Sequence, residues 1–244
     1  MNRTALVTGA STGIGYAISE VLAKDNYNVI INYINYENKA LELKEKIIQD
    51  GGNAIVVKAD ISKRKEVDNM FEVARNYFGQ IDVLVNNAGI SKQNLFTDIK
   101  DSEWNNMIDT NINGIFYCTQ NAIKDMISRK QGSIINISSI WGITGASCEV
   151  HYSTTKSAII GFTKALAKEL GPSNIRVNCI APGLIDTEMN SNISNEDKEN
   201  IVKETPLMRI GTVKDIALAA EFFASDSSKF ITGHVLNVSG GLVI

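Results

Sequence analysis

Short apolar runs alternate with helical segments along the 244-residue chain, and this alternation limits the possible folds more than any other feature. Nearly continuous β-branched runs are typical of strands buried on both faces, as in a parallel sheet. Repeated strand–helix alternation predicts an α/β fold with a doubly wound, seven-stranded parallel sheet and helices on both faces. The expected strands are residues 5–9, 28–33, 54–60, 81–87, 132–139, 175–183 and 234–241.

The segments between the strands suit crossover helices. Residues 37–52 end in two glycines and carry one apolar stripe, formed by Ala40, Leu43, Ile47 and Ile48. Residues 62–79 begin with Ser62 as an expected N-cap and end at Gly79. Because no linker, low-complexity tract or repeat interrupts the pattern, we expect a single domain over residues 1–244.

Charge and cysteine content exclude several classes of protein. The chain has 24 basic and 27 acidic side chains, a net charge of −3, which gives no sign of a nucleic-acid or membrane-surface binder. Three scattered cysteines without a CxxC spacing predict free thiols, with neither a disulfide framework nor a metal site. No signal peptide or run of 18 apolar residues is present, so we expect a cytoplasmic location.

Residues 184–212 break the alternation with a long polar segment between the sixth strand and the next helix. One interpretation is a solvated excursion that contains a short helix. The other is a mobile lid over a pocket at the carboxyl ends of the strands, where open α/β sheets bind ligands. Its position favours the lid.

A glycine-rich turn, "TGASTGIG" (8–15), follows the first expected strand and opens a helix. Gly9, Gly13 and Gly15 would let the backbone approach a pyrophosphate, which the helix N-terminus would bind through its unpaired N–H groups. A tight strand–helix turn without a ligand is the alternative.

Two further strand ends carry polar residues. Asp60 ends the third strand, where it could accept a hydrogen bond from an adenine amino group or cap the next helix. "NNAG" (86–89) ends the fourth strand, and its residues permit close contact with a ribose or simply a turn.

A tyrosine and a lysine stand four residues apart in "YSTTK" (152–156). Alone, this spacing would fit an ordinary surface helix. Together with TGxxxGxG, NNAG, Ser138–Ser139 and "APG" (181–183), in this order and across nearly the whole chain, it resembles the short-chain dehydrogenase/reductase family. The resemblance implies a Rossmann fold and a nicotinamide dinucleotide cofactor.

Ketone reduction needs a proton donor, and the resemblance implies which residues supply it. Tyr152 would transfer the proton, and an ammonium one helical turn away, on Lys156, would lower the phenol pKa. Lys156 would also hold a ribose hydroxyl, and Ser139 would bind the substrate carbonyl. Asn111 would support a water chain to the lysine, unless it is a solvent-facing helix residue. His151 is expected to pack or face solvent rather than act in catalysis.

The same resemblance implies the cofactor contacts. Ile185 through its backbone and Thr187 through its hydroxyl would hold the nicotinamide carboxamide. The full expected set is Gly9, Ser11, Thr12, Gly13, Ile14, Gly15, Tyr33, Asp60, Ile61, Asn87, Ala88, Gly89, Tyr152, Lys156, Pro182, Gly183, Ile185 and Thr187.

The second strand favours NADP(H) over NAD(H). An acid at its end would hold the 2′-hydroxyl of NAD and repel a 2′-phosphate, and this chain has Tyr33 there. No arginine is present either, and position 12, where many NADP enzymes carry a base, is Thr12.

Within the family, the chain is most similar to 3-oxoacyl-[acyl-carrier-protein] reductases of fatty acid synthesis. Lys130 could meet an acidic carrier protein, but Ser173–Asn174 supplies no second base. Residues 138–153 also resemble reductases of a 5-aminopentanone group on elongation factor P. A non-catalytic nucleotide sensor is disfavoured, because such proteins usually lose the tyrosine or the lysine.

The resemblance also implies a homotetramer. Its contacts would come from helices near 102–128 and 152–170 and from the apolar tail 240–244.

Overall fold

Seven parallel strands form one sheet in the order β3-β2-β1-β4-β5-β6-β7 in the computed structural model, which describes residues 2–191 and 193–244. All seven overlap the expected segments, so the predicted doubly wound Rossmann fold is confirmed. The strands are β1 (Thr4–Val7), β2 (Asn28–Tyr33), β3 (Asn53–Lys58), β4 (Val83–Asn86), β5 (Gly132–Ile137), β6 (Ile175–Pro182) and β7 (Val235–Val238).

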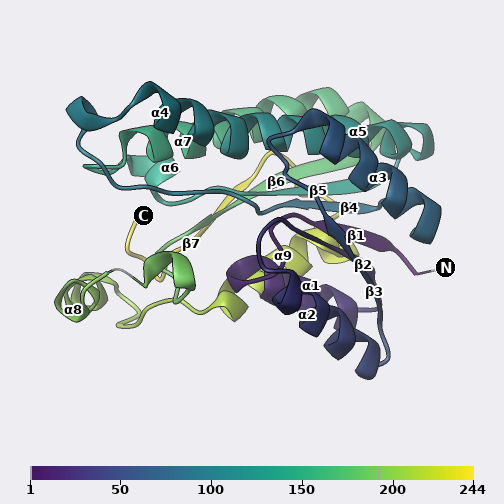
Figure 1. Cartoon of the computed structure of the whole chain (residues 1–244), viewed down its shortest axis with the longest axis horizontal. Coiled ribbons are helices and arrows are strands. Elements are labelled where there is room, and N and C mark those ends of the chain that lie inside the picture. Colours follow the sequence, from purple (N-terminus) through teal and green to yellow (C-terminus); the bar gives the residue numbers. More distant parts are fainter. Residues whose placement is uncertain (1, 192) are drawn as a thin grey trace.

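Helices cover both faces of the sheet (Figure 1). One face carries α1 (Gly13–Lys24), α2 (Glu37–Gln49) and α9 (Val213–Ala224). The other carries α3 (Arg64–Phe78), α4 (Asp101–Ile108), α5 (Gly114–Arg129), the short α6 (Trp141–Thr144) and α7 (Val150–Leu170). The helix α8 (Asn195–Glu204) lies away from both layers, at the end of the sheet where the C-terminus is found.

Neighbouring residues of each central strand enter different cores. Val29 and Ile31 pack with Ile18 beneath α1, whereas Ile30 packs with Phe71 beneath α3, and all are fully buried. Burial on both faces explains why the strands are apolar without alternation.

Two local expectations about the helices are wrong. Ser62 does not cap α3, because the helix begins at Arg64 and the Ser62 backbone N–H instead donates to the Asp60 carboxyl at 2.9 Å. Ile48 is 49% exposed, since it lies at the edge of the stripe on α2 that buries its other three members. The expected stop at Gly79 is confirmed, and its φ of +78° explains the glycine.

The long helix expected near 102–128 is divided by a π-helical turn at Asp109–Asn113, which separates α4 from α5. Single π turns of this kind often lie at functional sites. Here the turn contains Asn111, whose side chain is fully buried. Within the described residues, no helix is both long and apolar enough to cross a membrane.

Candidate active site

The strand order reverses between β1 and β4, and the loops that follow these two strands are joined by side-chain hydrogen bonds. The Thr8 hydroxyl accepts from the backbone N–H groups of Asn87 and Ala88, both at 3.0 Å. The Asn87 amide donates to the carbonyls of Thr8 at 2.9 Å and Gly9 at 3.1 Å. Open α/β sheets bind ligands at such a switch point.

The glycine-rich turn forms a cradle beside α1. Gly9 and Gly13 have φ angles of +60° and +57°, which side-chain-bearing residues rarely adopt. A Cβ on Gly15 would lie 2.5 Å from the Asn87 amide nitrogen. Thr12 does not cap α1 through its side chain, and the first turn has no acidic residue. The first N–H groups of α1 therefore suit an anion such as a pyrophosphate.

A buried asparagine that the sequence did not single out joins the ends of β1, β2 and β3. The Asn32 side chain accepts from the Gly9 backbone N–H at 3.2 Å and donates to the Ala59 carbonyl at 3.0 Å. Its position at the end of an apolar strand was the available signal. Asp60 follows Ala59, and its carboxyl accepts from the Ser62 backbone N–H in the turn after β3. The contact of Asp60 with an adenine amino group stays a prediction. Ile61 is buried in the core beneath α3.

An acidic residue, Glu37, lies near the end of β2, where the sequence indicated none. Tyr33 is buried, and Glu37 in the first turn of α2 lies near its phenol. Burial and this carboxylate raise the phenol pKa. Lys39, also in α2, forms an ion pair with Glu188 and lies over the ring of Tyr36.

The structure brings Ser139, Tyr152 and Lys156 together beyond the end of β5. The Ser139 hydroxyl accepts from the Trp141 backbone N–H at 3.1 Å and lies near enough to the Tyr152 phenol to lower its pKa. Lys156 lies one turn along α7, with its Nζ 5.4 Å from the centre of the Tyr152 ring and 3.0 Å from the Ile137 carbonyl to which it donates. The Ser138 hydroxyl donates to the Lys156 carbonyl at 2.7 Å, so Ser139 and not Ser138 faces the phenol.

Burial has the largest effect on the pKa values of Tyr152 and Lys156. Burial raises the pKa of Tyr152 to about 12, although the nearby Ser139 hydroxyl lowers it; the Glu149 carboxylate raises it further. Burial lowers the pKa of Lys156 to about 8. The Lys156 ammonium is directed to the Ile137 carbonyl, so the expected lowering of the phenol pKa by Lys156 stays a prediction.

Asn111 faces inward, so the solvent-facing alternative is wrong. Its side-chain amide donates to the Ile90 carbonyl at 2.9 Å and to the Thr155 hydroxyl at 3.1 Å, and its oxygen accepts from the Ile90 N–H. A Cβ on Gly89 would lie 3.2 Å from the Asn111 oxygen and 3.5 Å from Lys156 Nζ. Asn111 and Lys156 therefore lie next to each other against Gly89.

The residues after β6 complete the rim. Gly183 donates to the Val238 carbonyl at 3.0 Å, and the buried Ile185 follows. The Ile185 carbonyl accepts from the Asn190 amide at 2.8 Å. Thr187 reaches the glycine cradle, because its methyl carbon lies 3.6 Å from the Cβ position of Gly13.

The segment expected to form a lid, residues 184–212, leaves the sheet after β6 and returns to its own starting point. Its base is held where Ile185 pairs with Gly211, and α8 within it buries no residue. Residue 192 of the segment lies outside the described residues. Closure over a pocket stays a prediction.

Two of the three residues before Tyr152, Glu149 and His151, are buried. His151 packs inside, and neither ring nitrogen has a hydrogen-bond partner within the described part of the chain. Glu149 is 8% exposed, and its carboxylate is within reach of Gln93 Nε2 at 3.2 Å and Ser91 Oγ at 3.4 Å. The sequence pattern did not indicate Glu149, because a helix N-terminus commonly carries an acid.

Lys130 lies at the other end of the sheet. It is exposed at the end of α5, before β5 begins, and its carbonyl accepts from the Asn174 amide at 3.1 Å. Tyr152 lies beyond the carboxyl end of β5. A strand of this length separates the two ends by roughly 20 Å.

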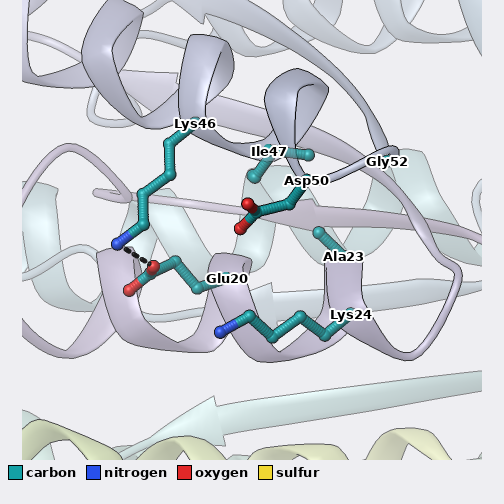
Figure 2. A pocket seen from close by; sticks show the side chains of 7 residues that line it. All are labelled: Glu20, Ala23, Lys24, Lys46, Ile47, Asp50 and Gly52. Carbon is teal, nitrogen blue, oxygen red and sulfur yellow. Dashed lines mark ion pairs between the residues drawn. The ribbon is translucent and has the colours of Figure 1, made fainter.

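A small cavity between α1 and α2 is separate from this site (Figure 2). Its volume of about 20 Å³ suits no more than a water molecule, and an ion pair of 2.6 Å between Lys46 and Glu20 crosses its edge. Gly52 places it near the start of β3, away from the glycine cradle.

A family model and several known proteins are similar to this chain over nearly its whole length. The family model described as enoyl-(acyl carrier protein) reductase matches residues 9–243. The 3-oxoacyl-[acyl-carrier-protein] reductase FabG of Staphylococcus epidermidis is 42% identical over 242 residues, 99% of each chain. That of Chlamydia muridarum is 42% identical over 99% of this chain and 98% of its own. The uncharacterized oxidoreductase YmfI of Bacillus subtilis is 43% identical over 99% of each chain.

Proposed function

Because the chain belongs to the short-chain dehydrogenase/reductase family and is an oxidoreductase that uses a nicotinamide cofactor, we propose that it reduces a ketone to a secondary alcohol with NADPH. The leading substrate is a 3-oxoacyl group on acyl carrier protein, and we assign the protein to fatty acid synthesis on that basis. The observation that carries the proposal is the grouping of Ser139, Tyr152 and Lys156 beyond the end of β5.

The residues present fit the proposed chemistry. The cradle of Gly9, Gly13 and Gly15 would hold the pyrophosphate of the cofactor, which supplies the hydride when bound. Ser139 and Tyr152 would together hold the carbonyl oxygen.

Tyr152 would donate the proton, since its raised pKa keeps the phenol protonated at neutral pH. Lys156 would favour its release while charged, and Asn111 would hold the neighbouring backbone in place.

The preference for NADPH rests on the end of β2. Tyr33 occupies the position of the acid that would bind the 2′-hydroxyl of NAD. Glu37 lies near the Tyr33 phenol, and Lys39, two residues further along α2, would exchange its ion pair with Glu188 for the 2′-phosphate. Measuring kcat/KM for NADPH and NADH tests the preference, and a higher value with NADH would refute it.

The carrier-bound substrate rests on the similarity to the two FabG proteins. Because Lys130 lies at the opposite end of the sheet from Tyr152, a carrier bound there would serve the site of a neighbouring protomer. We therefore propose a homotetramer, in which α5, α7 and the C-terminal segment form the contacts. Light scattering at micromolar concentration tests this, and the mass of one 26.7 kDa chain would contradict it.

Substitution of Lys130 separates carrier binding from the reaction. Lys130→Glu should raise KM for a carrier-bound 3-oxoacyl group and leave KM for a free thioester unchanged, because a charge at an interface rim acts mainly on association. An equal response of both substrates would exclude this docking surface. A parallel assay with a 2-enoyl thioester tests the reaction that the family model's description suggests.

A ketone on a modified protein side chain is the second candidate. Residues 138–153 carry the resemblance to reductases of that kind, and the buried carboxylate of Glu149 lies within this segment. If the protein does not reduce carrier-bound 3-oxoacyl groups, a ketone on a modified protein side chain becomes the preferred substrate.

A further inference from the structure

A single carboxylate is buried beside the proposed proton donor. Glu149 precedes α7 and lies three residues before Tyr152. Its side chain reaches the loop after β4, where Gln93 Nε2 lies 3.2 Å and Ser91 Oγ lies 3.4 Å from its two oxygens. Both donors are on exposed residues at the rim, whereas Glu149 itself is 8% exposed beneath them.

No cation neutralises this carboxylate within residues 2–191 and 193–244, where Glu149 takes part in none of the ion pairs. Lys92 on the same loop pairs with Glu103. Lys156 donates to the Ile137 carbonyl, and the ring nitrogens of the neighbouring His151 have no hydrogen-bond partner in the described part of the chain. Gln93 and Ser91 offer two neutral donors at long distances.

A structural role does not require the charge. A neutral glutamine could accept from Gln93 and Ser91 equally well, and a buried charge without a partner is costly. The Glu149 side chain does not cap α7 either, because it accepts no hydrogen bond from the first turn of the helix. Its charge also raises the pKa of Tyr152, which opposes formation of the phenolate. The negative charge therefore suits a ligand that brings a positive one.

We propose that Glu149 forms a subsite for a protonated amine carried by the substrate, so that the protein selects an amino ketone over a neutral ketone. The inference rests on the proposed reduction of a ketone and names the class of substrate. The amine would lie on the side of the reacting carbonyl that faces the loop of residues 90–94, in contact with the Glu149 carboxylate. A substrate of this class favours the protein-borne ketone over the 3-oxoacyl thioester.

Matched pairs of ketones that differ only in charge test the subsite. One pair is 5-(dimethylamino)pentan-2-one and its neutral isostere 6-methylheptan-2-one, and the second is 6-(dimethylamino)hexan-2-one and 7-methyloctan-2-one. A tertiary amine is protonated at neutral pH and cannot condense with its own ketone. The measured quantity is the ratio of kcat/KM for the cationic ketone to that for the neutral one, in which any effect on Tyr152 common to both cancels.

The parent protein should prefer the cationic member of at least one pair. Glu149→Gln should lower that ratio by about ten- to hundredfold, the usual effect of removing a charge-assisted hydrogen bond. Glu169→Gln, which alters an exposed glutamate on the same helix, should leave the ratio unchanged. A ratio that differs by less than about twofold between the parent and Glu149→Gln would overturn the subsite, as would a preference for the neutral ketone in both pairs.

Binding of the product alcohols to the protein with NADP⁺, measured by calorimetry, separates this inference from the proposed reaction. Tighter binding of the cationic alcohols that is lost in Glu149→Gln, without turnover of any ketone, would support the subsite and refute the reductase. Turnover of both ketones without a preference for charge would support the reductase and refute the subsite. Equal binding of the alcohols without turnover would refute both.

Discussion

Removing the hydroxyl of Tyr152 should stop the reaction and leave the fold intact. In the structure this hydroxyl lies near Ser139 and holds no backbone group, so Tyr152→Phe leaves no buried backbone polar atom unpaired. The loss of a general acid lowers kcat by roughly 10²- to 10⁴-fold, which corresponds to about 2.7–5.4 kcal/mol of transition-state stabilisation.

Tyr27→Phe makes the same chemical change at a position far from the site. The Tyr27 hydroxyl donates to the Ala224 carbonyl at 3.1 Å, in the core between the sheet and α9. Losing this bond should cost about 0.5–1.5 kcal/mol of unfolding free energy, a fall in Tm of about 2–4 °C per kcal/mol for a chain of this size. Its kcat should stay that of the parent.

The activity assay follows NADPH oxidation with a saturating ketone at about 340 nm, where the reduced nicotinamide absorbs. Thermal unfolding of the same samples is monitored by circular dichroism. Tyr152→Phe should lower kcat and keep the Tm of the parent, whereas Tyr27→Phe should lower Tm and keep the kcat of the parent. Cofactor affinity should be nearly unchanged in both. If Tyr152→Phe keeps half of the parent kcat, or if its loss of activity is matched by unfolding, the assignment of the proton donor is refuted.

Three further results are expected. Because burial lowers the pKa of Lys156 to about 8, its ammonium loses a proton above that pH, and kcat/KM for reduction should fall as the pH rises through about 8. Lys156→Arg should abolish this fall, because a guanidinium stays charged at that pH. A parent kcat/KM that stays constant to about pH 9.5 would contradict the prediction. Gly15→Ala should raise the Kd for NADPH by about tenfold or more in fluorescence titration, because the new Cβ meets Asn87 and Gly9, whereas Gly161→Ala, with open space at its Cβ, should not change it. Thr212→Ala, which removes the cap of α9, should cost about 1 kcal/mol in denaturant unfolding, and Ser194→Ala at the cap of the unburied α8 should cost much less.

The sequence predicted the sheet well because apolar runs report burial directly. It could not separate the edge of a helical stripe from its centre, as Ile48 shows, because that depends on the angle at which α2 packs. It placed Ser139, Tyr152 and Lys156 near one another through their family spacing. It missed Asn32 and Glu149, because nothing in a single polar residue at the end of an apolar run, or before a helix, tells which way its side chain points. The pKa of Tyr152 also needed the structure, since the depth of a phenol cannot be known from its neighbours in sequence.

The side-chain amides of Asn32 and Asn87 have a consequence for how the site could change over evolutionary time. They fasten the ends of β1, β2, β3 and β4 to one another through backbone groups, so the floor under the cofactor is set before any ligand arrives. The rim at residues 91–98 is largely exposed and joined to α7 by few bonds. Substitutions at the rim can therefore change which substrate the oxidoreductase accepts without moving the proposed cofactor site, which makes substrate choice and cofactor placement separable traits.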